Sequence, residues 1–188
     1  MPDFAKTPAN YAPLTPVSFL HRAAMTHPER TSVVYGSIRR SWAETYSRCK
    51  KFASALHAAG LEKGDVVGVI ATNTPEIYEA HFGVPMAGMV LNTLNCRLDA
   101  STIAYILEHS NTRLLIVDRE FAETVKEAIA ELATPPILID IDDPAAPYGP
   151  RLSETDYESF LEGGDADFNY LPPDDEWDSI SINYTSGT

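Results

Sequence analysis

The chain has 188 residues, enough for a domain with a real hydrophobic core. Hydrophobic residues at 44% and charged residues at 22% are typical of soluble globular proteins, and no apolar run approaches the roughly 20 residues that span a bilayer. The formal net charge of -13, without a basic face, argues against nucleic acid or an anionic membrane as the main partner.

The first part of the chain predicts a helix, a hairpin and a second helix. Apolar residues recur at helical spacing over residues 16–25, and the helix is expected to stop before Pro28. Residues 31–41 read as two short strands around a glycine turn. Ser41 is a plausible N-cap for the amphipathic helix 42–59, which Gly60 should end.

Strands and helices then alternate. Residues 64–73 contain a nearly continuous apolar run, as expected of a parallel strand covered on both faces, and Thr74, Pro75 and Glu76 form a typical helix start. The same alternation continues with strands at 90–94, 112–118 and 135–142 and helices at 99–111 and 120–133. Such alternation predicts an α/β fold: a doubly wound, mostly parallel sheet with helices on both faces.

Residues 140–178 are rich in Pro, Gly and Asp and hold 13 acidic residues but one basic residue, Arg151. We interpret this stretch as a solvated linker rather than an acidic docking surface, with one short helical piece inside it. The chain is then expected to re-enter the sheet as a buried strand at 179–184. The predicted organisation is therefore an α/β core at 1–139, an acidic excursion at 140–178 and a final strand with a loop at 179–188.

Several residues invite a chemical role but have simpler explanations. Cys49 and Cys96 lack any paired spacing, so we expect reduced, partly buried thiols. His81 has no partner spaced for catalysis, and Glu76 and Glu79 are read as acids that meet the helix dipole. Because the start of the chain lacks the layout of a secretory signal, we expect a cytoplasmic protein.

Ligands of open parallel sheets bind beyond the carboxyl ends of the strands. Three of these ends hold residues that a turn, a cap or a loop explains: Thr72–Thr74, Asn95–Arg97 and Asp118–Arg119. The fourth is different, because three hydroxyl residues surround a glycine directly after an apolar strand: Thr185, Ser186, Gly187 and Thr188. Glycine admits close approach of the backbone, and hydroxyls with exposed N–H groups donate to phosphate oxygens. On composition alone, phosphate binding and an ordinary strand-to-helix turn both stay open.

A family resemblance favours the first interpretation. YTSGT at 184–188 resembles the first half of the YTSGTTGxPKG motif of the acyl-adenylate-forming (AMP-binding) enzymes, and residues 39–118 resemble the opening of that superfamily almost throughout, including AGMVLNTLNCRL at 87–98. Within it, the chain is most similar to acyl-CoA synthetases for short or medium acyl chains, including the methylmercaptopropionate-CoA ligase type.

The resemblance implies a two-step reaction in fatty acid metabolism: a carboxylic acid and ATP give an acyl-adenylate and pyrophosphate, and CoA then displaces AMP. It also implies that Thr185, Ser186, Gly187 and Thr188 hold the ATP phosphates, with Thr185 a candidate ligand for the Mg2+ of Mg-ATP. The lysine half of the loop and all later catalytic segments are absent from these 188 residues. The leading hypothesis is therefore an inactive fragment of such an enzyme, without catalytic residues of its own. The alternative is a non-catalytic α/β binding or dimerisation module, and a homodimer remains open.

Overall fold

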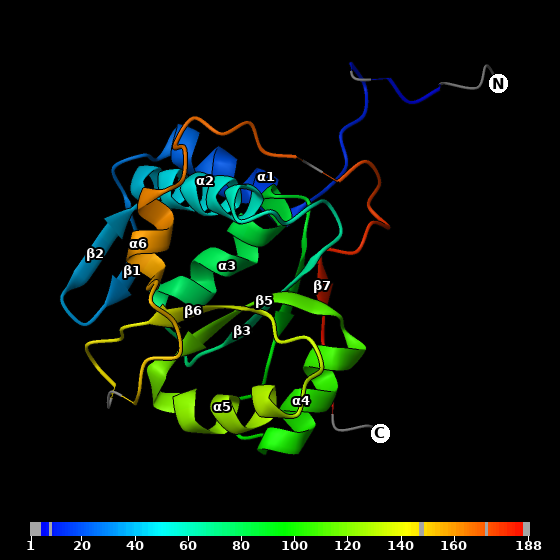
Figure 1. The fold of residues 1–188 in the computed structure, drawn as a ribbon. Helices are drawn as coiled ribbons and strands as arrows, with labels where there is room; N and C mark the ends of the chain where they lie inside the picture. The colour runs from blue at the N-terminus through cyan, green and yellow to red at the C-terminus, as the bar shows by residue number, and fades with distance from the viewer. Residues whose placement is uncertain (1–4, 8, 147–148, 172, 186–188) are drawn as a thin grey trace.

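The fold of the chain comes from a computed structural model, which describes residues 5–7, 9–146, 149–171 and 173–185. Its centre is one five-stranded sheet in the order β6-β5-β3-β4-β7, in which every neighbouring pair is parallel (Figure 1). The strands are β3 (Val66–Ile70), β4 (Val90–Thr93), β5 (Thr112–Asp118), β6 (Ile137–Ile141) and β7 (Ser181–Ile182). A separate antiparallel hairpin consists of β1 (Thr31–Tyr35) and β2 (Ile38–Ser41).

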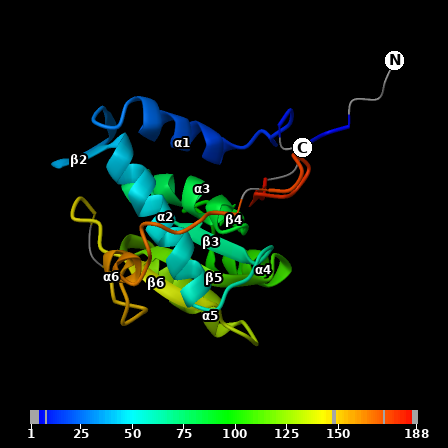
Figure 2. The ribbon, with the colours of Figure 1, turned by 90° about the horizontal axis from the view of Figure 1, so that it is seen from above.

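Helices cover both faces of the sheet, which confirms the predicted doubly wound α/β class. Figure 1 shows α2 and α3 on one side of the sheet and α4 and α5 on the other, and Figure 2 shows α1 lying outside α2 and α3. The helices are α1 (Pro16–Thr26), α2 (Trp42–Ala58), α3 (Pro75–Met86), α4 (Ala100–His109), the 3-10 turn η1 (Arg119–Phe121), α5 (Ala122–Ala130) and α6 (Tyr157–Glu162).

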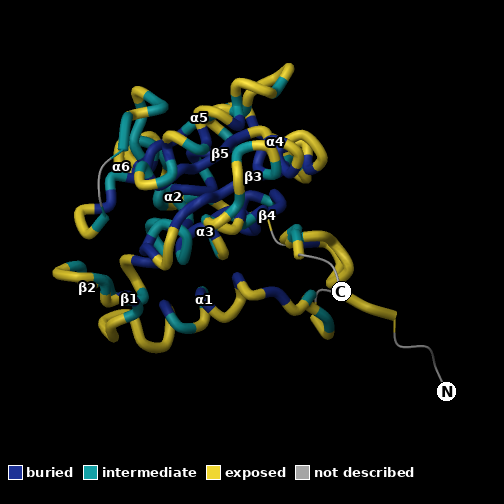
Figure 3. The backbone as a smooth tube through the Cα atoms, turned by 90° about the horizontal axis from the view of Figure 1, so that it is seen from below, coloured by how far each residue is buried: buried dark blue, intermediate teal, exposed yellow. Residues whose placement is uncertain are grey.

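The central strand β3 holds the core together. All five of its residues are buried, and it pairs with β4 on one side and β5 on the other. Successive side chains of a strand point to opposite faces, so Val67 and Val69 join the core beneath α2 and α3 while Ile70 joins the core beneath α4 and α5. Figure 3 shows the central strands buried and the hairpin mostly exposed.

The helix boundaries follow local signals in the sequence. Ser41 and Glu44 form a capping box at the start of α2: each side chain accepts a hydrogen bond from the other residue's backbone N–H. Gly60, just after α2, has a φ of +86°, a conformation that glycine adopts without strain. Thr74 occupies the N-cap position of α3 and Pro75 its first turn, as predicted, but the Thr74 side chain makes no capping hydrogen bond.

The acidic stretch is only in part a solvated linker. Asp140 and Asp143 are buried, and α6 packs the side chains of Tyr157 and Leu161 into the core beneath α2. Beyond α6 the chain crosses from the β6 edge of the sheet to the β7 edge, passing over α2 (Figures 1 and 2). The backbone N–H of Leu171 donates to the carbonyl of Met86 at 2.8 Å along this path. The excursion is therefore packed in part, because Tyr157 and Leu161 reach the core while Trp177 stays exposed.

The last strand also differs from its prediction. A buried strand was expected over 179–184, but β7 covers only Ser181–Ile182, and both residues retain exposure to solvent. The backbone N–H of Leu91 donates to the carbonyl of Ile180 at 3.0 Å, which registers β7 against β4. Among the described residues β7 has one pairing partner, so it forms an edge of the sheet.

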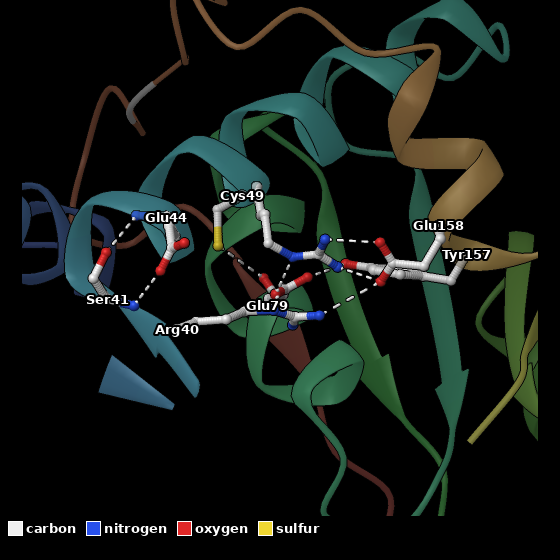
Figure 4. A network of polar contacts seen from close by, with 8 residues as sticks. Arg40, Ser41, Glu44, Cys49, Glu79, Tyr157 and Glu158 are labelled. Carbon is white, nitrogen blue, oxygen red and sulfur yellow. Dashed lines mark hydrogen bonds and ion pairs between the residues drawn. The ribbon is translucent and has the colours of Figure 1, made fainter. Parts of the chain in front are cut away.

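Glu79 is another correction, because it does not serve the helix dipole. Its side chain is fully buried, and its Oε1 accepts from Arg40 Nη1 and Arg48 Nε, both at 2.6 Å. Its Oε2 accepts from the Tyr157 hydroxyl at 3.0 Å, and Arg48 also forms two hydrogen bonds with Glu158 (Figure 4). This network joins the hairpin, α2, α3 and α6, and it satisfies a charge that would be costly to bury alone.

No helix within the described part of the chain is long and apolar enough to cross a bilayer.

Candidate functional site

The order of the strands locates the crevice where ligands of such sheets bind. The chain winds from β3 to β4 in one direction and then crosses back to β5 on the other side of β3. The loop after β3 runs toward β4 and the loop after β5 toward β6, so the winding reverses between β3 and β5 and the loops beyond their carboxyl ends diverge. β7 lies beside β4 and runs parallel to it. The residues that follow β7 therefore lie at the carboxyl end of the sheet, with the loops after the other strands.

The loops after β3 and β4 are held by structural contacts. The Cys96 thiol donates to the carbonyl of Ala71 at 3.1 Å, which ties the second loop to the end of β3. Asn95 Oδ1 accepts from the backbone N–H of Arg97 at 3.0 Å, a local turn of the kind that asparagine side chains form. Thr74 is buried at the start of α3. The structure thus supports the plain interpretation of both loops.

The loop after β5 has the same character. Asp118 Oδ1 accepts from the backbone N–H of Glu120 at 3.1 Å and so caps η1. Burial, followed by the negative charges of Asp143 and Glu120, raises the pKa of the Asp118 carboxyl despite that bond. The guanidinium of Arg119 donates to the Asp142 carboxylate and to the Gly149 carbonyl, so structural contacts account for this side chain as well.

Tyr184, which follows β7, is anchored to the end of α4. Its hydroxyl lies 2.7 Å from His109 Nδ1, and its ring meets the His109 ring edge to face with centroids 5.8 Å apart. The Tyr105 ring stacks on the His109 ring, with centroids 5.4 Å apart. The backbone leaving β7 is therefore fixed just before the hydroxyl-rich loop begins.

Thr185 is the described member of the predicted phosphate loop. It is exposed and follows the anchored Tyr184, so its hydroxyl is free of the core. Ser186, Gly187 and Thr188 lie outside the described residues. An exposed hydroxyl at this edge can donate to an anionic oxygen or offer its own oxygen to a hard cation such as Mg2+.

Within the described residues no group of three or more His, Cys, Asp or Glu side chains could hold a metal ion. A magnesium ion that arrives on ATP brings phosphate oxygens as ligands and needs few from the protein. The Thr185 hydroxyl fits the role of one protein ligand to such an ion, but not that of a complete protein site for a free ion.

Two of these relationships carry no local signal in the sequence. His109 and Tyr184 are 75 positions apart, and Glu79 meets Arg40, Arg48 and Tyr157 across separations of 31 to 78 positions. The stacking of Tyr105 on His109 has the four-residue spacing that places side chains on one helix face, which was the available hint.

The profile of the family "AMP-binding enzyme" matches residues 20–188, and the chain belongs to that family.

The curated relatives extend the comparison over the whole chain. The chain is 49% identical to an acetate–CoA ligase of Humulus lupulus over 99% of its length, and 43% identical to an acetate/butyrate–CoA ligase, peroxisomal, of Arabidopsis thaliana, also over 99%. A peroxisomal benzoate–CoA ligase of Arabidopsis thaliana is 43% identical as well. The chain spans about a third, 35%, of the length of the first two.

Solved structures give the same fold. An anthranilate CoA ligase in complex with anthranoyl-AMP superposes with a TM-score of 0.85 at 20% identity, over 97% of this chain and 34% of its own. The N-terminal domain of FACL13 from Mycobacterium tuberculosis gives a TM-score of 0.75 at 26% identity, over 92% of this chain and 41% of its own.

The expectation of a cytoplasmic protein is wrong by this comparison. Relatives from Arabidopsis thaliana and Petunia hybrida, at 43 to 44% identity, are peroxisomal enzymes. The lack of a secretory pattern did not bear on this question, because peroxisomal addresses include a short C-terminal signal that a receptor reads.

Proposed function

We propose that the chain is the N-terminal part of an ATP-dependent acyl-CoA synthetase. The reaction joins a carboxylic acid to CoA: ATP first gives an acyl-adenylate and pyrophosphate, and the CoA thiol then displaces AMP. The observation that carries this proposal is the 40 to 49% identity, over nearly the whole chain, to relatives named as CoA ligases.

The hydroxyl-rich loop would hold the phosphates of Mg-ATP during the first step. The Thr185 hydroxyl lies at the carboxyl edge of the sheet, beyond a tyrosine anchored by His109. Fixed donors at this place stabilise the charge that develops on the departing pyrophosphate without having to reorganise. The role of Ser186, Gly187 and Thr188 in the same loop is part of this proposal.

The substrate is proposed as a small carboxylic acid. Relatives are named for acetate, butyrate, 2-methylpropanoate and benzoate, which are all small monocarboxylates. A short or medium acyl chain, and with it a role in fatty acid metabolism, suits most of these names.

The test is a pair of variants in the longest product of the gene. Thr185→Val removes the hydroxyl from the loop, and Thr134→Val removes an exposed hydroxyl between α5 and β6 as the control. We expect kcat/KM for ATP to fall about tenfold to hundredfold in the first variant, the loss of one hydrogen bond to a charged group. Pyrophosphate release across a panel of small acids gives the measurement and the preferred substrate.

The 188-residue chain assayed beside it should release no pyrophosphate. If the long product made acyl-CoA without consuming ATP, or if the two threonine variants behaved alike, the proposed role of the loop would be refuted. A stable dimer of the 188-residue chain that binds no nucleotide would favour the alternative, a non-catalytic dimerisation module.

A further inference from the structure

The last turn of α4 carries an exposed histidine whose ring contacts two tyrosines. His109 Nδ1 lies 2.7 Å from the Tyr184 hydroxyl, and the Tyr184 ring meets the imidazole edge to face. The Tyr105 ring, from the same helix, stacks on His109 with an interplanar angle of 23°. One hydrogen bond and two ring contacts together restrict the orientation of the imidazole. A side chain on the helix surface is therefore ordered by partners on α4 and after β7.

A buried polar group fixes the backbone beneath His109. Asn92 of β4 is fully buried, and its Nδ2 donates to the Ser110 hydroxyl at 3.2 Å. Ser110 is the C-cap residue of α4, and its hydroxyl lies 2.7 Å from the Thr112 hydroxyl on β5. Asn92 is also the register partner of Ile182 on β7. The end of α4 is thus joined to two strands, one of which pairs with the strand that leads to Tyr184.

Asn92 carries a cost that its place in the core does not require. Its Oδ1 is buried and has no hydrogen-bond partner within the described part of the chain. An unpaired buried acceptor is destabilising, and an apolar side chain at this position would avoid that penalty. Asn92 is therefore better explained by where it places the end of α4 than by the stability of the core.

We propose that His109 is a positioning residue for the adenylation step: it holds Tyr184 so that the next residue, Thr185, presents its hydroxyl in one place. Consecutive Cα atoms are about 3.8 Å apart, so a fixed Tyr184 leaves Thr185 few positions. Donors that are fixed before the reaction stabilise the charge of the transition state most effectively. This inference rests on the proposed function, because it assigns His109 a part in the same reaction.

A simpler role for His109 makes a different prediction. A histidine in the last turn of a helix also suits the helix dipole, and that role alone affects stability but not the rate of the reaction. The test therefore separates kcat from KM in the longest product of the gene. His109→Leu removes the hydrogen bond, and His109→Asn keeps a polar amide near the place of Nδ1. Glu108→Gln, an exposed neighbour on α4, is the control.

In His109→Leu we expect kcat for pyrophosphate release to fall about threefold to tenfold, the effect of one ordinary hydrogen bond, with KM for ATP changed less than about twofold. His109→Asn should recover most of the rate, and Glu108→Gln should match the parent. If His109→Leu does not fold, Tyr184→Phe replaces it, since that variant keeps the ring and loses the hydroxyl.

Two further measurements address the path through Tyr184 and Thr185. The double variant of His109→Leu with Thr185→Val should lose less activity than the product of the two single losses, because both changes act on the same hydroxyl. In the 188-residue chain with isotope-labelled histidine, Tyr184→Phe should shift the NMR resonance of His109 Nδ1.

A His109→Leu variant with full activity, in a long product that consumes ATP, would overturn this role and leave the proposed function standing. Equal losses in the leucine and asparagine variants, fully multiplicative losses in the double variant, or an unchanged Nδ1 resonance would overturn it as well. A parent long product that makes no acyl-CoA would refute the proposed function, and the role of His109 in adenylation would fall with it.

Discussion

The Arg48 guanidinium donates through Nε to the Glu79 carboxylate at 2.6 Å, between α2 and α3, while its other nitrogens hold Glu158 on α6. Glu79 has no exposed side-chain surface, and the Arg48 side chain keeps 19% of its surface exposed. Arg48 and its two carboxylate partners therefore link α2, α3 and α6. Burial opposes the Arg48 charge, but its hydrogen bonds with Glu158 and Glu79 outweigh that effect and raise the guanidinium pKa.

Glu79→Gln should destabilise the chain strongly. The variant leaves the charges of Arg40 and Arg48 facing a neutral amide, and loss of one partner of a buried ion pair costs about 3 to 5 kcal/mol. We expect the low end of that range, because both arginines retain some exposure and Glu158 stays in place. Urea unfolding gives the free energy of unfolding.

Glu154→Gln is the matched control, since Glu154 is an exposed carboxylate in the same excursion as Glu158. It should change the free energy of unfolding by no more than about 0.5 kcal/mol. Equal stability of the two variants would show that the network contributes nothing.

Tyr35 should titrate late. Its hydroxyl donates to the Asp143 carboxylate, and this bond, with burial and nearby negative charge, raises the pKa from 10.0 to about 12. A raised pKa in the folded state means that the bond contributes its full stability below about pH 10, and that this contribution is lost as pH rises through about 12. Phenolate absorbance, taken as the difference between the chain and Tyr35→Phe, measures the midpoint.

Asp143→Asn should move that midpoint back toward the ordinary tyrosine value, because the carboxylate charge is gone. A midpoint that does not respond to Asp143→Asn would contradict the role given to this hydrogen bond.

Gly83→Ala should be destabilising although alanine favours helices. A Cβ at Gly83 in α3 would lie 2.4 Å from Phe52 Cδ1 and 3.2 Å from the carbonyl oxygen of Cys49, so α2 and α3 would have to separate. Overpacking of this kind costs about 1 to 3 kcal/mol. Most of that range exceeds the gain in helix propensity from glycine to alanine, which is about 1 kcal/mol. The melting temperature should fall accordingly.

Gly163→Ala supplies the comparison, because the nearest atom to its new Cβ is 3.5 Å away and its φ is -72°. This variant should melt close to the parent chain. A Gly83→Ala variant that melted as high would show that α2 and α3 can adjust freely.

The two cysteines should differ in reactivity. Cys49 is fully buried, and burial raises its thiol pKa well above the ordinary value; burial also raises that of Cys96, which is only half-buried. The thiolate is the reactive form of cysteine. We therefore expect only Cys96 to react in the native chain, and slowly, whereas both thiols should react fast in urea. A chromogenic disulfide reagent counts them, and Cys96→Ser should remove the native reaction. Two fast thiols in the folded chain would contradict this burial.

Features that depend on neighbouring residues lie where the sequence predicts them. The apolar run around Val67, the N-cap at Ser41 and the turn at Gly36 each involve contacts within a few positions, and all three lie where they were expected. The α/β class followed from the alternation of such segments, because strands joined through helices pair in parallel and place the helices on the faces of the sheet.

The phosphate-binding role of the loop stays a prediction that rests on composition. The run of hydroxyls around Gly187 is visible in the residues themselves, and Thr185 is exposed. The anchor for this loop, His109, is not visible in the same way, because the sequence does not state which helix end will meet the last strand.

The sequence by itself thus determined the order and kind of the elements, because short-range hydrogen bonding and hydrophobic periodicity act along the chain. Only the tertiary structure decided that Glu79 is a buried charge, that the acidic excursion packs through Tyr157, and that Tyr184 rests on His109. Those outcomes depend on side chains brought together across tens of residues, and burial changes the energy of a charge far more than its position in the sequence indicates.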